Sequence, residues 1–399
     1  MKASPMLLGI FFFTALSFIG TIFTDSDPTF DCLTQDGPIE VVSGNHGRKR
    51  FEPKTAPYKK FDARNATFEI PDTISHQMIS LRDDGNDDHS MCWAGGYITA
   101  SSDWHGLDIS WEQSKQGYDN DENDRGEMEN TSSATSYEDN TTWTGMHVYN
   151  VHDGIRTNNS KDNWTVQHSW FEYVRDDCLE NDHIYSGLIF DVLFDGCYAG
   201  VSVRPSSSGL GQDKTIKLDK VLLRMEPMPY PYKWDETDNP KLYPAGYGDT
   251  PFGYGNAFKL HNGNEPTVEI TNSVFLHEYD AGRTIFPPKE SVSVCHNNTI
   301  IWLAGPDSAP YYLDEDFPDC FTIITNTAEG RRTWTSYVRE WHERHPEVGA
   351  AHKPLNPGAY VWPRYSYSAE AGSGDSEVVK EIGIFERILF YLRSLLPKN

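Results

Sequence analysis

Residues 143–205 contain the pattern on which the fold prediction rests: WTGMHVYNVHDGIRTNNSKDNWTVQHSWFEYVRDDCLENDHIYSGLIFDVLFDGCYAGVSVRP. A short phrase recurs in this stretch, as Asp153-Gly154-Ile155-Arg156, Asp177-Cys178-Leu179-Glu180 and Ala199-Gly200-Val201-Ser202. Its apolar residue falls at positions 155, 179 and 201, so the repeat is 24 and then 22 residues long. A period of about 20 to 30 residues with short β-rich segments predicts a stack of similar coils, not a helix bundle or a doubly wound sheet.

Similar segments recur later in the chain. Residues 268–275 and 292–301 alternate apolar and polar residues and carry an asparagine before the next apolar pair, and residues 321–326 are expected to form the last coil. Asparagine suits a repeated turn because it tolerates the left-handed conformation and can hydrogen-bond along the stack. The sequence therefore predicts an all-β protein, a right-handed parallel β-helix with loop excursions and a C-terminal amphipathic helix.

The composition divides the chain into six segments. Residues 1–24 are apolar after Lys2 and predict a signal peptide or a signal anchor, so the rest of the protein is expected to be secreted, periplasmic or on the cell surface. Helical spacing of Trp334, Val338 and Trp341 predicts a helical cap, and a second helical pattern follows a linker rich in Pro, Gly and Ser. The remaining boundaries are an extended lead-in (25–66), the β-helix (67–330), the helical cap (331–351), the linker (352–376) and the amphipathic helix (377–399). Residues 6–23 and 377–396 could contact a membrane.

Charge and cysteine content narrow the functional classes. The net charge of −25 excludes nucleic acid as an expected partner, because phosphates would repel the protein. Six cysteines follow the targeting segment, and in an exported chain this even number permits three disulfides, whose pairing the sequence leaves open. Sequons for N-glycosylation occur at Asn65, Asn130, Asn140, Asn158, Asn163 and Asn297.

The repeat over residues 143–326 resembles the pectin-lyase-like superfamily of right-handed parallel β-helices. Within it, Asp153-Gly154-Ile155, Asp176-Asp177-Cys178-Leu179 and Tyr198-Ala199-Gly200-Val201-Ser202 resemble, in order, the Asn-Thr-Asp, Asp-Asp and Gly-His-Gly motifs of the polygalacturonase family of inverting glycoside hydrolases. The resemblance implies that Asp153, Asp176 and Asp177 are the catalytic carboxylates. The chain departs from the family at Tyr198-Ala199, where the family has Gly-His, and Thr215-Ile216-Lys217 keeps only part of the family's Arg-Ile-Lys.

The residues themselves support a related expectation. Asp153 and Asp177 occupy equivalent places in successive coils, about 4.8 Å apart, and close carboxylates separate each other's pKa values. One can then act as a general acid while another activates water, as in glycoside hydrolysis, which needs no cofactor. Four further residues of the same region are candidates for substrate binding: Arg156, Arg175, His183 and Arg204.

Three functions remain open on this basis, all with a polysaccharide or glycan as the partner. The first is hydrolysis by the paired aspartates. The second is β-elimination by a polysaccharide lyase, with Ca²⁺ held by acidic residues that include Glu180 and Asp182, and with an arginine as base or clamp. The third is a surface or adhesion protein without catalysis, which presents aromatic side chains to a glycan: Trp143, Trp164, Trp170 and Tyr173. A purely structural role of the aspartates, neutralised by Arg156 and Arg175, is the alternative to all catalytic assignments.

Overall fold

The computed structural model describes residues 32–47, 49–53, 59–70, 78–82, 90–100, 132–157, 162–203, 211–226, 228–229, 252–253, 257–260, 266–277, 287, 291–303 and 320–350. They fall within one compact unit, residues 32–399. The predicted targeting segment, the linker and the amphipathic helix at residues 377–399 lie outside the described residues. No helix among the described residues is long and apolar enough to cross a membrane.

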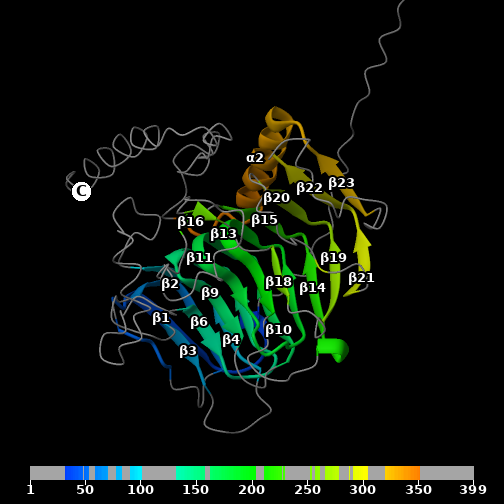
Figure 1. The fold of residues 1–399 in the computed structure, drawn as a ribbon. Helices are drawn as coiled ribbons and strands as arrows, with labels where there is room; N and C mark the ends of the chain where they lie inside the picture. Colours follow the sequence, from blue (N-terminus) through cyan, green and yellow to red (C-terminus); the bar gives the residue numbers. More distant parts are fainter. Residues whose placement is uncertain are drawn as a thin grey trace, which may run out of the picture. The chain divides into compact units, whose positions relative to one another are not determined.

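Twenty-one strands form one sheet in which every described strand pair is parallel (Figure 1). The strands fall into three faces. The first face contains β4 (Cys92–Ala94), β7 (Thr142–Thr144), β10 (Trp164–Gln167), β12 (Gly187–Phe190), β14 (Thr215–Asp219), β19 (Thr267–Thr271) and β21 (Val292–His296). The second face contains β5 (Tyr97–Ala100), β8 (His147–Val151), the first parts of β11 (Trp170–Glu180) and β13 (Leu193–Val203), β15 (Leu222–Met225), β20 (Val274–His277), β22 (Asn298–Trp302) and β23 (Phe321–Ile324). The third face contains β3 (Ile79–Leu81), β6 (Ser132–Ser136), β9 (Asp153–Thr157), the second parts of β11 and β13, and β18 (Phe258–Leu260).

The chain visits the first, second and third faces in that order and then pairs with the preceding coil, which is consistent with a parallel β-helix. The predicted repeat is confirmed by the strand register, because Ile155 pairs with Leu179 and Leu179 pairs with Val201. All three side chains are fully buried in the same core. The apolar line at positions 155, 179 and 201 is therefore an interior column of the third face.

The second face has a longer interior column. One inward-facing residue of each strand pairs with the equivalent residue of the next coil, so these side chains stack along the axis. Such stacking is expected because a single coil cannot bury its apolar side alone. The column consists of Phe68, Ile98, Val148, Phe171, Phe194, Leu223, Phe275 and Ile300.

The corner between the first and second faces is built from residues with positive φ. Asn272 and Asn297 have φ values of 52° and 57°, and the Nδ2 of Asn297 donates a hydrogen bond to the Oδ1 of Asn272 at 2.8 Å. The expected use of asparagine at a repeated turn is thus observed in these two coils. The same corner position has positive φ at Gly95, Gly145, His168, Asp191 and Lys220.

The six cysteines form three disulfides: Cys32–Cys92, Cys178–Cys197 and Cys295–Cys320. The second joins β11 to β13 in adjacent coils. Three disulfides indicate an oxidising, extracellular folding environment.

The sheet begins inside the segment assigned to the lead-in. β1 (Ile39–Asn45) pairs with β2 (Lys60–Ile70), which crosses the first two faces. The short 3₁₀ helix Cys32–Thr34 precedes β1, and the Nζ of Lys60 donates to the carbonyls of Leu33, at 3.1 Å, and Gln35. A second 3₁₀ helix spans Gly211–Asp213, and an antiparallel pair forms from β16 (Met228–Pro229) and β17 (Phe252–Gly253).

One long helix, α2 (Thr327–Arg344), follows the last strand of the described sheet. The predicted helical spacing is observed, because Trp334, Val338 and Trp341 lie on its buried side. The helix does not close the end of the stack but packs on the outer side of the second face (Figure 1). The surface beneath it is apolar: Trp170, Leu193, Leu222, Val274, Leu276 and Ile301.

Candidate functional site

The predicted aspartates meet at the corner between the second and third faces. His152 lies at the turn from β8 to β9, and Asp153 is the first residue of β9. In the next coil, β11 turns the same corner without ending, through a register shift between Val174 and Asp177. Such a bulge lets neighbouring residues depart from strict alternation, so Asp176 and Asp177 can face the same group. We refer to Asp153, Asp176 and Asp177 as the acid cluster.

Glycine is required beside Asp153. A Cβ at Gly154 would overlap the carbonyl oxygen of Cys178 in the next coil. The close approach of the two coils brings the Oδ1 of Asp153 to 3.4 Å from the backbone nitrogen of Asp177. The close packing of the two coils therefore explains why glycine follows Asp153.

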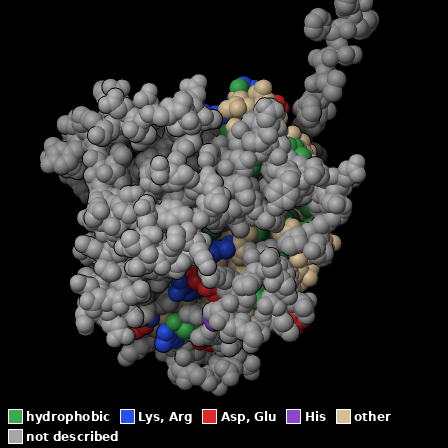
Figure 2. All heavy atoms as spheres, in the orientation of Figure 1, with side chains coloured by type: hydrophobic (Ala, Val, Ile, Leu, Met, Phe, Trp, Pro, Cys, Tyr) green, Lys and Arg blue, Asp and Glu red, His purple; other side chains and the backbone are tan. Residues whose placement is uncertain are grey.

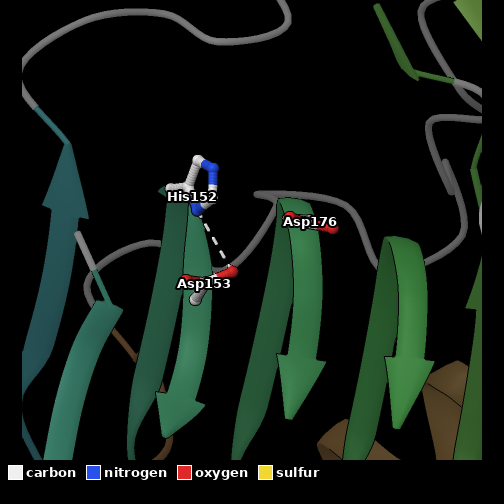
Figure 3. A group of neighbouring side chains, drawn as sticks. All are labelled: His152, Asp153 and Asp176. Carbon is white, nitrogen blue, oxygen red and sulfur yellow. Dashed lines mark ion pairs between the residues drawn. The ribbon is translucent and has the colours of Figure 1, made fainter. Parts of the chain in front are cut away.

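Asp153 is held by two cationic or polar side chains. Its Oδ1 lies 3.1 Å from the Nδ1 of His152, and its Oδ2 accepts a hydrogen bond from Arg156 at 3.1 Å (Figure 3). Asp176 is on the neighbouring strand in the same view, and the backbone nitrogen of Asp176 donates to the carbonyl of His152 at 2.8 Å. Both predicted coils thus contribute to one local network.

Lys259 joins the other two aspartates. Its Nζ lies 3.2 and 3.1 Å from the two carboxylate oxygens of Asp177 and 3.6 Å from the Oδ1 of Asp176. Lys259 belongs to β18, three coils beyond β9 on the third face. One ammonium group therefore faces two carboxylates.

A polar row runs along the third face beside the acid cluster. Strand register places Arg156, Glu180, Ser202 and Lys259 at the same position of four successive strands. The Nε of Arg156 donates to Glu180, so this guanidinium bridges Glu180 and Asp153. The Oγ of Ser202 is buried and makes no hydrogen bond among the described residues.

The environment moves the pKa values of two aspartates in opposite directions. Burial raises the pKa of Asp177 to about 8; Lys259 opposes this rise, and repulsion from Asp176 and Asp153 adds to it. Burial would also raise the pKa of Asp153, but His152, Arg156 and Lys259 outweigh it and hold that pKa below its ordinary range. The surroundings therefore favour the protonated form of Asp177 and the ionised form of Asp153.

The three aspartates of the acid cluster are buried, whereas the neighbouring Lys259 and Arg156 side chains are partly exposed. Asp153, Asp176 and Asp177 are 2%, 5% and 3% exposed. The side chains of Lys259 and Arg156 are 33% and 22% exposed. On the face drawn in Figure 2, basic, acidic and histidine side chains are visible among the described residues. The two cations are therefore the more exposed members of this network.

One group in the described part of the chain could hold a metal ion. Ligand atoms of His152, Asp153 and Asp176 lie within 4.8 Å of one another. An imidazole with two carboxylates suits a transition metal better than Ca²⁺, which prefers oxygen ligands only. Arg156 and Lys259 already supply positive charge to these carboxylates, and this charge opposes a further cation.

The other predicted site residues are distributed as follows. Glu180, an expected metal ligand, instead accepts a hydrogen bond from Arg156. Asp182 and His183 lie in the turn after β11, at the next corner of the coil, where His183 stacks on Tyr185 with ring centroids 5.9 Å apart. Burial lowers the pKa of His183. Arg204 and the side chain of Arg175 lie outside what the structure describes.

The aromatic candidates for glycan contact are interior or covered residues. Trp143, Trp164, Trp170 and Tyr173 are between 1% and 7% exposed. Trp143 and Trp164 belong to the main core, and Trp170 packs beneath α2. The idea that these four side chains present a glycan-binding surface is wrong for this structure.

Lys259 is the site residue that the sequence analysis missed. It lies 82 residues from Asp177 in the sequence, so no local motif links the two. Lys217, in the partial match to Arg-Ile-Lys, lies on the first face instead and pairs with Glu269 at 2.9 Å. The short apolar-Lys-apolar pattern of β18 could have indicated a coil strand, but not its position beside the aspartates.

Comparisons with known proteins give no family assignment. No protein-family model matches the chain, and neither a curated protein nor a solved structure is significantly similar to it.

Proposed function

We propose that this protein is an exported, right-handed parallel β-helix that hydrolyses glycosidic bonds of a polysaccharide. Asp177 is the general acid and protonates the leaving oxygen. Asp153 is the ionised partner that activates water or stabilises the positive charge at the sugar. Lys259 and Arg156 supply positive charge beside Asp176 and Glu180.

The observation that carries the proposal is that two neighbouring buried carboxyl groups, Asp153 and Asp177, have surroundings that move their pKa values in opposite directions. A glycosidase needs one carboxylic acid and one carboxylate at the same pH. Environments that separate the pKa values of two close acids are the usual means of obtaining this pair. Asp177 and Asp153 meet this condition through burial, mutual repulsion and the unequal placement of His152, Arg156 and Lys259.

Burial of the cluster sets a condition on the proposal. Catalysis requires that a sugar ring and a water molecule reach carboxyl groups that are at most 5% exposed here. If substrate cannot reach these carboxyl groups, the same ion-paired network serves only to join the coils. Activity therefore separates the catalytic role from the structural one.

The two other functions have less support. The lyase proposal is weakened because Glu180, one of its candidate Ca²⁺ ligands, and Arg156, one of its candidate bases, bind each other. The binding proposal loses its aromatic surface, since the four aromatic candidates are buried.

The test is incubation of the secreted protein with a panel of neutral glycans and uronans between about pH 5 and pH 8. New reducing ends without ultraviolet absorbance are expected. Absorbance from an unsaturated sugar would replace the hydrolase with a lyase. No product from any glycan, together with retained binding, would favour the non-catalytic function.

A further inference from the structure

The sequons of the described chain share one structural setting. Asn65, Asn140, Asn163 and Asn297 are all exposed. The threonine two residues later lies in or opens a strand in each case: Thr67 in β2, Thr142 in β7, Thr165 in β10 and Thr299 in β22. The remaining sequons, at Asn130 and Asn158, lie outside the described residues.

Three of the four asparagines occupy left-handed turn positions. Asn140, Asn163 and Asn297 have φ values of 53°, 61° and 57°. A side chain at such a corner projects from the coil instead of lying against a sheet face. All four asparagines are therefore exposed, three of them at turns between strands.

Asn140 and Asn163 are stacked on the same corner. Thr142 pairs with Thr165, so the two asparagines occupy equivalent positions in successive coils. Their backbone nitrogens donate to carbonyls of the following coil, at Asp162 and Ser186, and so the backbone fixes the turns without the asparagine side chains.

All four asparagines avoid the corner that holds the acid cluster. Asn140 and Asn163 lie between the third and first faces, and Asn65 and Asn297 lie between the first and second faces. The acid cluster lies between the second and third faces. Large groups at the sequons would therefore leave the approach to Asp153 and Asp177 open.

We propose that Asn65, Asn140, Asn163 and Asn297 carry N-linked glycans. The side-chain amide nitrogen forms a bond to C1 of an oligosaccharide that is supplied as its polyprenyl diphosphate. The bond from C1 to the diphosphate oxygen breaks, the amide nitrogen loses one proton, and the lipid diphosphate leaves. This modification occurs in the secretory compartment in which disulfides also form.

The existing contact of Asn297 is compatible with the modification. Its Nδ2 donates to Asn272, and a glycosylated amide nitrogen keeps one hydrogen for such a bond. The turn therefore does not depend on an unmodified amide.

The test is peptide mass spectrometry on protein isolated from its own cells, before and after an amidase that releases N-glycans and converts the modified asparagine to aspartate. We expect conversion at all four positions, and none at Asn181, which is buried and has no sequon. Thr142→Val removes the sequon but keeps Asn140, and it should abolish conversion of Asn140 to aspartate. Thr142→Ser keeps the sequon and should retain this conversion. An unmodified asparagine at any of the four positions overturns the assignment for that position.

This inference is independent of the proposed function. A variant with glutamine at all four positions should lose the glycans at these positions and keep its release of reducing ends. Glycans without hydrolase activity in the parent protein would refute the proposed function alone, and activity without glycans would refute this inference alone.

Discussion

Asp177→Asn should change the pH dependence of folding stability. The folded pKa of Asp177 is about 8, and its ordinary value is 3.8. Between these values the folded protein holds a proton that the unfolded chain releases, so the free energy of unfolding falls as pH rises through this window. One such group contributes a slope of about 1.4 kcal/mol per pH unit and an upper limit of roughly 6 kcal/mol over the window. Asparagine mimics the protonated acid and cannot ionise.

Asp153 contributes with the opposite sign and in a different window. Its folded pKa is depressed, so its stabilisation is present above the ordinary pKa and is lost only as pH falls toward the lower folded value. Above about pH 4 the pH dependence of stability therefore reports on Asp177, and below it on Asp153.

Urea unfolding with intact disulfides, followed by tryptophan fluorescence at several pH values from about 4.5 to 8.5, measures this effect. Asp177→Asn should resemble the parent protein at the acidic end, show a flatter pH dependence, and be the more stable protein at the alkaline end. Asp213→Asn, which changes an exposed acid, should leave the slope of the parent protein unchanged. An equal slope in the parent protein and Asp177→Asn would refute a raised pKa for Asp177.

Three further changes test the packing around the site. Gly154→Ala should cost about 1–3 kcal/mol or more in urea unfolding, because the added methyl overlaps the carbonyl of Cys178; unchanged stability would show that the coils can separate at this corner. Replacing Cys178 and Cys197 together by alanine opens a loop of sequence separation 19 and should lower the free energy of unfolding by roughly 3 kcal/mol, and a midpoint equal to that of the parent protein would contradict this. Trp341→Ala removes a fully buried side chain whose Nε1 donates to the carbonyl of Asp191 at 3.0 Å. It should cost about 3–5 kcal/mol and expose α2 to limited proteolysis, whereas a resistant helix would show that other contacts suffice.

The repeated coil could be predicted from sequence because its period is local information. Ile155, Leu179 and Val201 stack in register, as the spacing indicated. The outward packing of α2 could not be predicted, because its apolar side would suit either the end or the flank of the stack. The early start of the sheet was missed because β1 and β2 contain many polar residues, which face outward at the first coil.

The site was predictable only in part. The repeat places Asp153 and Asp177 in adjacent coils, but the bulge that brings Asp176 beside Lys259 depends on how β11 turns the corner. The pairing of Arg156 with Glu180 likewise follows from strand register, which sets side chains of different coils opposite each other. The position of Lys259 depends on where β18 joins the third face, 82 residues after Asp177, and neither composition nor spacing determines that point.

The most direct test of the proposed chemistry compares product release by the parent protein with release by Asp153→Asn and Asp177→Asn. The polysaccharide should be one that the panel identifies, with Asp213→Asn as the control and circular dichroism to confirm folding. Loss of a general acid or base is expected to lower the rate by roughly 10²- to 10⁴-fold in each folded site variant, with the control unchanged. Product release by both folded variants at the rate of the parent protein would show that the acid cluster only holds the coils together.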